Sequence, residues 1–320
     1  VKNAAVESLY VNGAYLTEFT GQDNWDVDDN EVTIGGQYNS GSVEELFIGY
    51  LDEIRASGTV RSSDWIKLCY ENQKSDQTLV SFIEPPEDYR TWDYSGKVAI
   101  NTKESGADVS GDVHNFPLLV RLDTSNFDFS QAMSNGHDIR FSKSDISRHL
   151  SYERERWNFT ATDSSAEFWV LCDTVFGNDS TQYIKMYWGK ANAPDMSNGA
   201  EVFDTDNDFT GTWHMNEDPS GGSNSIKDRT DNSNHGDPFG SMDANDLVEG
   251  IIGNCLDFDG DNDVIDIDDG DLSTSAGTIT FWSKVSNFGS DQCDYFFGHS
   301  SDNSSPQDRI QIYTNDTGGN

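Results

Sequence analysis

The sequence predicts an all-β protein built of sandwiches or jelly rolls, and three observations support this prediction. Short stretches that alternate in polarity, or that are rich in β-branched and aromatic residues, recur at close intervals. Clusters of Gly, Asn, Asp and Ser separate them, as turns require. One stretch alone stands out with a helical period. The clearest predicted strands are SLYVNG, EVTIGG, LFIGYLDEIR, FPLLVRL, AEFWVLC, YIKMYWG, NCLDF and GTITFWSKV.

The single predicted helix is SSDWIKLCYENQK. Either Ser62 or Ser63 is placed to be its N-cap, because a serine hydroxyl accepts a hydrogen bond from the first turn. We expect this helix to pack on the edge of a sandwich. Four residues share its predicted buried face: Trp65, Leu68, Cys69 and Asn72.

Two composition changes divide the chain into three predicted segments. Pro85 and Pro86 interrupt the chain after the helix, and the composition shifts after them. A second change falls near Phe203 and Asp204, where a new strand-rich segment begins. We therefore predict segments 1–84, 85–203 and 204–320.

The chain is strongly acidic, with 57 Asp and Glu against 20 Lys and Arg in 320 residues and a formal net charge of -37. Such a field repels nucleic acids and anionic membranes, so we expect neither as a partner. Two interpretations of the acid remain open. One is a hydrated shell suited to high salt, as in halophilic proteins; the other is an extracellular surface that takes up divalent cations. The 34% hydrophobic content predicts a folded chain.

Several features favour an extracellular or cell-surface location without membrane insertion. No apolar run approaches the roughly 20 residues needed to span a bilayer. The start VKNAAVESLY lacks the pattern of a signal peptide, so we expect any export signal outside this stretch. The candidate glycosylation sites have the Asn-x-Ser/Thr pattern: Asn158, Asn178, Asn303 and Asn315.

Both ends of the chain resemble a known family. SLYVNG, VTIGG and FIGYLDEIRASGTVRSSDWIKLCYENQ resemble the closing half of a laminin-G-like, concanavalin A-like jelly roll. GTWHMNED, SIKDRTDNSNHG, GNCLDFDGDNDVIDI and GTITFWSKV resemble the opening half of the same fold. The resemblance implies jelly-roll halves at residues 1–84 and 204–320.

The central segment resembles a different family. WDYSGKVAI, NFPLLVRLDTSNFDF, NGHDIRFSKSD, LSYERERW, EFWVLCDTV and YIKMYWGKANA are similar to an uncharacterised extracellular β domain. That domain of unknown function is often found beside laminin-G-like modules. The resemblance implies a central β-sandwich domain at 85–203.

Half a sandwich exposes a long apolar edge, so something must cover each terminal half. Three arrangements remain open. The chain is an excerpt of a tandem array, or the C-terminal half of one subunit pairs with the N-terminal half of a neighbour to form a filament, or the halves close within one chain. We expect the two ends to meet in a shared β sandwich, most productively between neighbouring subunits. A partner copy of the chain is therefore expected.

A dense carboxylate cluster is the candidate metal site. Calcium takes six to eight oxygen ligands, and the Asp-rich turn in LDFDGDNDVIDIDDGD offers many. The laminin-G-like resemblance also implies a calcium site at a rim. The alternative is a set of outward-facing Asp residues on an acidic surface. The candidate ligands are Asp259, Asp261 and Asp263.

The four cysteines form no CxxC pair, which makes zinc ligation a poor interpretation. Cys172 lies in the apolar run FWVLC and is expected to be a buried small hydrophobe. Cys69, Cys255 and Cys293 are the candidates for a disulfide, with the pairing left open.

Aromatic side chains in polar surroundings are candidates for stacking on sugar rings. Trp25 lies among acids in a polar stretch, and Trp92 and Tyr94 have similar surroundings. Trp169, Trp188 and Trp282 lie in strand-like runs and are predicted to be core residues.

No catalytic constellation is visible in the sequence. Alternation along LDEIR places Asp52 and Glu53 on opposite faces, which separates a carboxylate pair, and it makes Glu53 and Arg55 a same-face pair. HExxH, GxSxG and phosphate-binding glycine motifs are absent in suitable contexts. The sequence therefore favours a non-enzymatic extracellular adhesion or assembly protein that binds glycans or forms filaments. The alternative is a carbohydrate-binding accessory region of a larger polysaccharide-degrading enzyme.

Overall fold

The computed structural model divides the chain into two compact units. The first comprises Val1–Tyr10, Tyr15–Arg61 and Asp204–Asn320, and the second comprises Val11–Ala14 and Ser62–Phe203. The structure describes residues 2–3, 6–20, 32–39, 42–44, 46–83, 92–145, 148–160, 163–267, 276–285, 293–300 and 309–315.

The first unit contains two large antiparallel sheets and one hairpin. The eight-stranded sheet has the order β18-β19-β7-β21-β1-β2-β3, with β16 also paired to β7. Its strands are β1 (Lys2–Asn3), β2 (Val6–Val11), β3 (Ala14–Thr20), β7 (Ile48–Ser57), β16 (Phe209–Trp213), β18 (Leu247–Glu249), β19 (Asn254–Asp259) and β21 (Ala276–Val285).

The second large sheet of this unit has the order β17-β20-β4-β22-β23. Its strands are β4 (Val32–Ile34), β17 (Gly236–Phe239), β20 (Val264–Ile267), β22 (Cys293–Ser300) and β23 (Arg309–Asn315). The hairpin joins β5 (Gln37–Asn39) to β6 (Ser42–Glu44), and two short 3-10 turns are η2 (Thr205–Asn207) and η3 (Pro219–Gly221).

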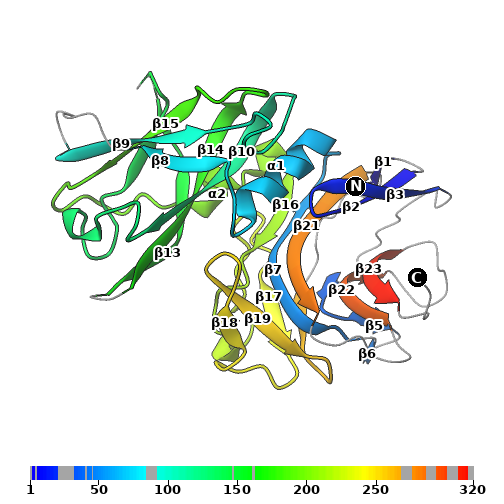
Figure 1. Cartoon of the computed structure of the whole chain (residues 1–320). Coiled ribbons are helices and arrows are strands. Elements are labelled where there is room, and N and C mark those ends of the chain that lie inside the picture. The colour runs from blue at the N-terminus through cyan, green and yellow to red at the C-terminus, as the bar shows by residue number, and fades with distance from the viewer. Residues whose placement is uncertain are drawn as a thin grey trace. The chain divides into compact units, whose positions relative to one another are not determined.

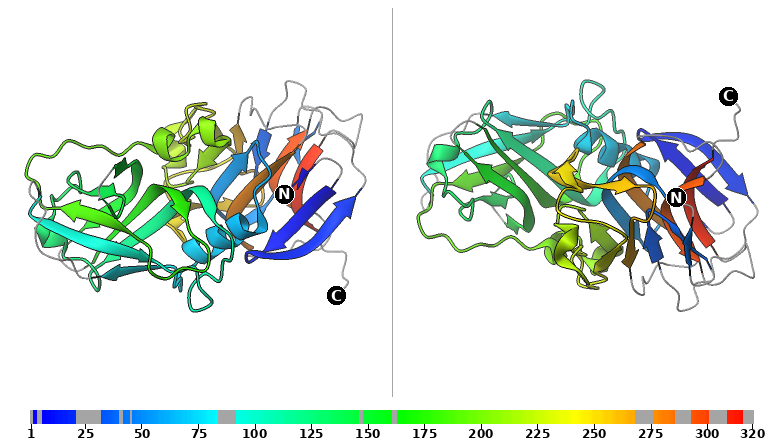
Figure 2. Two further views of the ribbon diagram at one scale, coloured as in Figure 1. Left: turned by 90° about the horizontal axis from the view of Figure 1, so that it is seen from above. Right: turned by 90° about the horizontal axis from the view of Figure 1, so that it is seen from below.

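Strands from the two ends of the chain alternate in these sheets. β7 lies between β19 and β21, and β4 lies between β20 and β22. Figures 1 and 2 show blue N-terminal strands beside orange and red C-terminal strands. The expected meeting of the two ends is thus observed, and it takes place within one chain.

One hydrophobic core joins the two sheets of the first unit. N-terminal residues such as Ile34, Phe47 and Leu51 pack with C-terminal residues such as Phe258 and Phe297, all fully or almost fully buried. Burial of apolar area is the main force that holds sheets together. Both segments of the chain therefore contribute residues to this core.

The second unit is a smaller sandwich. One sheet has the order β10-β14-β13, and the other has the order β12-β11-β15-β9-β8. Its elements are α1 (Ser63–Gln73), β8 (Val80–Ile83), β9 (Tyr94–Ile100), β10 (Val113–Asp123), η1 (Phe129–Gln131), β11 (Arg140–Ser142), β12 (His149–Leu150), β13 (Tyr152–Phe159), β14 (Ser164–Val175), β15 (Tyr183–Trp188) and α2 (Gly199–Val202).

The predicted helix is observed as α1, and Ser62 is its N-cap, accepting a hydrogen bond from the Trp65 N–H. The predicted face is buried. Its Trp65 ring contacts Phe116 of β10 edge to face, while Arg121 of β10 donates to the carbonyl of Gln73 at the helix end. These contacts place α1 in the second unit.

The all-β prediction is confirmed, and the unit boundaries refine the predicted segments. One boundary between the two units falls between Phe203 and Asp204. Another falls between Arg61 and Ser62 instead of after residue 84. The reason is physical: β8 pairs with β9, and α1 packs on β10, so the residues before Pro85 belong to the second sandwich.

No helix in the part of the chain that the structure describes is both long enough and apolar enough to cross a membrane.

Candidate functional site

Strand β7 carries a bulge at the LDEIR motif. In its pairing with β21, Asp52 lies opposite Trp282 and Arg55 lies opposite Thr280, so two β7 residues face one partner residue between them. Glu53 lies in this bulge with a backbone φ of 56°, a value that is rare for residues other than Gly or Asn. The extra residue lets Leu51 and Ile54, three positions apart, both reach the core. Simple alternation, which placed Asp52 and Glu53 on opposite faces, does not apply across this bulge.

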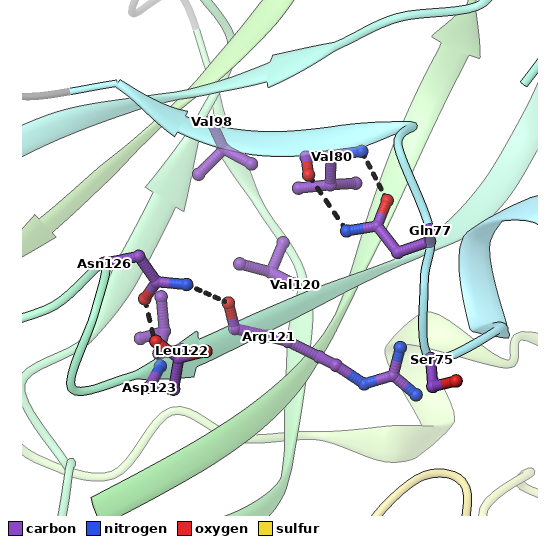
Figure 3. A pocket seen from close by; sticks show the side chains of 9 residues that line it. All are labelled: Ser75, Gln77, Val80, Val98, Val120, Arg121, Leu122, Asp123 and Asn126. Atoms are coloured by element: carbon purple, nitrogen blue, oxygen red, sulfur yellow. Dashed lines mark hydrogen bonds between the residues drawn. The ribbon is translucent and has the colours of Figure 1, made fainter. Parts of the chain in front are cut away.

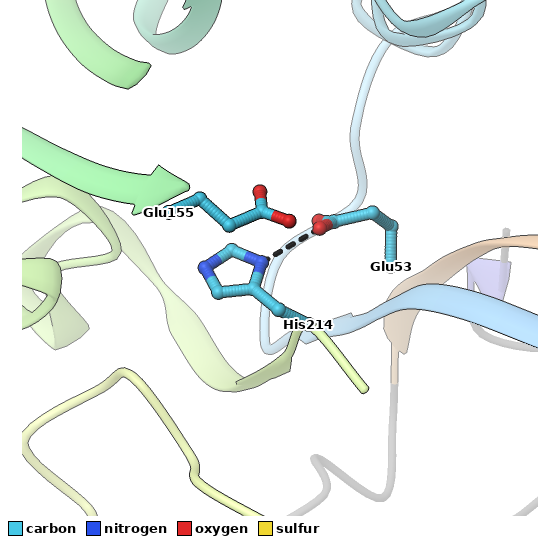
Figure 4. A group of neighbouring side chains, drawn as sticks. All are labelled: Glu53, Glu155 and His214. Atoms are coloured by element: carbon cyan, nitrogen blue, oxygen red, sulfur yellow. Dashed lines mark hydrogen bonds and ion pairs between the residues drawn. The ribbon is translucent and has the colours of Figure 1, made fainter. Parts of the chain in front are cut away.

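The bulge forms a buried charged cluster of Glu53, Arg55 and His214. Glu53 Oε2 accepts a hydrogen bond from Arg55 at 2.7 Å, and Glu53 Oε1 lies 2.7 Å from His214 Nδ1. Figure 4 shows the Glu53 and His214 side chains pointing toward one another. Both side chains are fully buried. The same-face pair of Glu53 and Arg55 is confirmed, and His214 joins it from the C-terminal segment.

The pKa of Glu53 reflects two opposed effects. Burial raises the pKa, because it disfavours the charged carboxylate. The nearby His214 and Arg55 lower it by charge and by hydrogen bonding, and the net pKa is below the ordinary value of a glutamate. Glu53 is thus an ionised, buried carboxylate whose two oxygens are both hydrogen-bonded.

Asp52 has a different role from Glu53. One of its carboxylate oxygens accepts hydrogen bonds from the backbone N–H groups of Ile251 and Ile252, at 3.0 and 3.2 Å. Asp52 is almost completely buried. It therefore ties the turn between β18 and β19 to β7.

A second buried carboxylate organises the stretch after β16. Asp228 accepts hydrogen bonds from the backbone N–H groups of Thr212, Thr230 and Asn234, and also from the Thr230 hydroxyl. Burial is the largest influence and raises the pKa of Asp228. Its neighbour Glu217 pairs with Arg229 at 2.7 Å, and burial raises the pKa of Glu217 as well.

The hydrogen bonding of these buried carboxylates fits a structural role better than a catalytic role. A general acid or base needs a proton path to a substrate, whereas Glu53, Asp52 and Asp228 direct their carboxylates to internal donors. Sequence reasoning did not single out His214 or Asp228. The position of His214 directly after the strand FTGTW was the available signal for a paired, buried residue.

The predicted metal ligands lie at the connection between β19 and β20, which belong to different sheets. Asp259 accepts hydrogen bonds from the backbone N–H groups of Asp261 and Asn262, and Asp263 accepts from Ser241 and Asp259. Within neither unit do three described His, Cys, Asp or Glu side chains bring their ligand atoms together at metal-binding distance. The later acids of the motif, Asp268, Asp269 and Asp271, lie outside the described residues.

Calcium binding by residues 257–271 stays a prediction. If it is right, calorimetry will detect binding heat, and chelation will lower the melting temperature because a ligand that binds only the folded state stabilises it. Asp261→Asn should weaken binding, because this exposed carboxylate is a candidate ligand. An unchanged melting temperature together with absent binding heat would contradict the prediction.

The predicted aromatic ligands do not form one platform. Trp92 is only 9% exposed and packs with Tyr187 and Ala193. Tyr94 is 39% exposed and stacks on Trp188, with ring centroids 5.9 Å apart. Because Tyr187 and Trp188 are consecutive in β15, their side chains lie on opposite faces of the sheet. Trp25 lies outside the described residues.

Three cysteines are described as buried side chains outside any disulfide: Cys69, Cys172 and Cys255. Cys69 and Cys255, two of the disulfide candidates, are thus not bonded in this structure, and the side chain of Cys293 lies outside the described residues. Cys172 is 3% exposed, as expected for a core residue. Burial raises the pKa of the Cys172 thiol to about 12.

Alkylation should reveal this protection of Cys172. With a pKa of about 12, only about one thiol in 10⁴ is ionised at pH 8, so native Cys172 should resist iodoacetamide and react after denaturation. The raised pKa contributes stability that is present below the ordinary thiol pKa and is lost as the pH rises toward 12. Peptide mass spectrometry measures the labelling. Labelling of the native protein at the rate of the denatured one would contradict this expectation.

Two glycosylation candidates are described with their side chains. Asn178 is exposed in a turn with φ of 50°, and Asn158 is half-buried in β13. Asn303 and the side chain of Asn315 lie outside the described residues.

The second unit has a pocket of about 180 Å³ near β8, β9 and β10, drawn in Figure 3. Val80, Val98 and Val120 line it, together with polar side chains that include Gln77 and Asn126. Gln77 makes two hydrogen bonds with the Val80 backbone, and Asn126 accepts from the Asp123 N–H. A pocket of this volume has room for on the order of six water molecules or for one small molecule the size of benzene.

One comparison with known proteins gives a match. Residues 135–217 match the model of a domain of unknown function (DUF2341). This stretch runs from before β11 through β16 and includes His214. Neither the curated proteins nor the solved structures give a match. The predicted central domain of unknown function therefore has support, and the laminin-G-like resemblance stays an interpretation.

Proposed function

We propose that this chain is a non-enzymatic extracellular adhesion or assembly protein that binds glycans. The observation that carries the proposal is the construction of the first unit from both ends of the chain. β7 and β4 each lie between strands of the C-terminal segment, and the core draws on both segments.

This construction favours assembly. Residues 62–203 separate the two contributing segments, so the same strands of a second copy could make identical pairings. Exchange of identical elements between copies needs no new contact surface. A head-to-tail exchange of this kind makes an open filament, and a reciprocal exchange makes a closed dimer.

The buried charged cluster supports a non-enzymatic role. Both oxygens of Glu53 are engaged by Arg55 and His214, and Asp228 is surrounded by internal donors. A glycoside hydrolase needs two carboxylates that face a substrate from opposite sides. The cluster has the properties of a structural element instead.

Glycan binding draws support from exposed aromatic rings of the second unit. Tyr94, Phe159 and Phe176 are 39–52% exposed, and an exposed ring face can stack on a sugar ring as other aromatic contacts do. The same feature fits the second candidate, an accessory region of a polysaccharide-degrading enzyme. The sequence of a longer parent protein would distinguish the two.

Two measurements test the proposal. Light scattering across a concentration series should detect species larger than one chain, and a panel of plant, algal and bacterial polysaccharides should show binding without turnover. A monomer that binds no glycan would contradict the proposal. Turnover that is abolished by Glu53→Gln would contradict its non-enzymatic part.

A further inference from the structure

The outward face of the five-stranded sheet in the second unit carries basic residues, although the chain as a whole is acidic. Phe141 of β11 contacts Phe168 of the other sheet, so its register partner Met186 also points inward. Alternate residues then point outward. The outward positions of β9, β15, β11 and β12 are Ser95, Lys97, Ala99, Tyr183, Lys185, Tyr187, Arg140, Ser142 and His149.

These positions contain basic residues but no Asp or Glu, in a chain where acids outnumber bases by 57 to 20. Lys97 and Lys185 lie directly opposite each other on neighbouring strands. Like charges in this position destabilise a sheet. The Lys97 ammonium lies 4.2 Å from the centre of the Tyr183 ring, which offsets part of this cost.

The other cations of this unit mostly have acidic partners. Lys67 pairs with Asp108 at 2.7 Å, and Arg156 pairs with Glu167 at 2.6 Å. The same holds for Arg154 with Asp195 and for Arg148 with Asp173, both at 2.7 Å.

Lys97, Lys185 and Lys190 differ from these cations, since none of them forms an ion pair with a carboxylate of the described residues. Lys190 is exposed, and its ammonium lies 5.1 Å from the centre of the Trp92 ring. Arg140 lies 5.4 Å from that ring and extends the positive area, although its donors bond to backbone carbonyls and to the Tyr152 hydroxyl. We call Lys97, Lys185 and Lys190 the lysine face.

We infer that the lysine face binds an anionic polysaccharide with uronate carboxylates. This inference rests on the proposed glycan binding and names its ligand class. Ammonium groups that form no ion pair within the described residues can be matched by carboxylates of a ligand, and such charge-assisted bonds are stronger than neutral ones. Asp138 accepts a hydrogen bond from the Gly189 N–H beside Lys190. Screening limits electrostatics to about 8 Å at physiological salt, so acids farther away than this weaken the local positive area little.

A uronate chain fits better than a nucleic acid. A duplex carries one charge per about 1.7 Å and is bound through a broad basic surface. Beyond the lysine face, such a duplex would meet a protein whose net charge is -37. A uronate chain has fewer charges per unit length and offers hydroxyl groups for hydrogen bonds.

The test uses the whole chain and polygalacturonate, with neutral dextran and single-stranded DNA as comparison polymers. Calorimetry or affinity electrophoresis should show binding to polygalacturonate that weakens as NaCl rises. Lys97→Glu/Lys185→Glu should weaken it about tenfold or more. Lys103→Glu/Lys227→Glu makes the same change in net charge at two lysines that are not part of the lysine face, and this control should keep the binding. If Lys97→Glu/Lys185→Glu fails to fold, Lys97→Gln/Lys185→Gln replaces it in the same binding measurement.

Each outcome decides the inference. Equal weakening by both charge-reversal variants would overturn it, as would binding to DNA in preference to polygalacturonate. Binding to neutral glycans without binding to polygalacturonate would overturn the inference and leave the proposed glycan binding standing. Absence of binding to every glycan would contradict the proposed glycan binding itself.

Discussion

Glu53→Gln is expected to lower the free energy of unfolding by about 3–5 kcal/mol, because it leaves Arg55 and His214 buried without their anion. Glu53 accepts hydrogen bonds from both groups at 2.7 Å in the wild type. Denaturant titration followed by tryptophan fluorescence measures the loss. The matched control is Glu249→Gln in the same unit, on an exposed strand position, with an expected change within about 0.5 kcal/mol.

The effect of Glu53→Gln should depend on pH. The folded pKa of Glu53 is lower than its ordinary value, so the folded state binds the proton less tightly than the unfolded state. The carboxylate therefore contributes stability that is present above the unfolded pKa and is lost as the pH falls through the folded pKa. The difference between wild type and variant should shrink in acid. A difference that is independent of pH would contradict this account of the cluster.

Phe258→Ala is the second change with a large expected effect, about 3–5 kcal/mol for removal of a fully buried aromatic side chain. Phe258 is 1% exposed and contacts Phe47 edge to face, with ring centroids 6.3 Å apart. The variant therefore removes a contact between the two chain segments of the first unit. Calorimetry should show a lower melting temperature for this unit.

Phe239→Ala is the control for that experiment. It removes the same side chain from a position of the first unit that is 52% exposed, so little should change. Equal losses in the two variants would show that Phe258 is not part of a core. An unchanged transition in Phe258→Ala would contradict the shared core directly.

Local patterns in the sequence determined much of this protein. Alternating strands and turn clusters predicted an all-β chain, and the spacing of Trp65, Leu68 and Cys69 behind Ser62 predicted the helix. The pair of Glu53 and Arg55, predicted from a spacing of two, is also observed, although the bulge at Glu53 interrupts regular alternation. These predictions could be made from the sequence because secondary-structure propensity, hydrophobic period and helix capping are properties of a few neighbouring residues.

Other features were decided by the tertiary structure alone. The bulge at Glu53 depends on the pairing with β21, which lies more than 200 residues later. His214 becomes the partner of Glu53 only because β16 pairs beside β7. The closure of both ends within one chain and the burial of Trp92 on Tyr187 likewise require distant segments to meet. Contacts between distant segments leave no local period in the sequence, so the buried charged cluster and the lysine face emerge only from the register of the folded sheets.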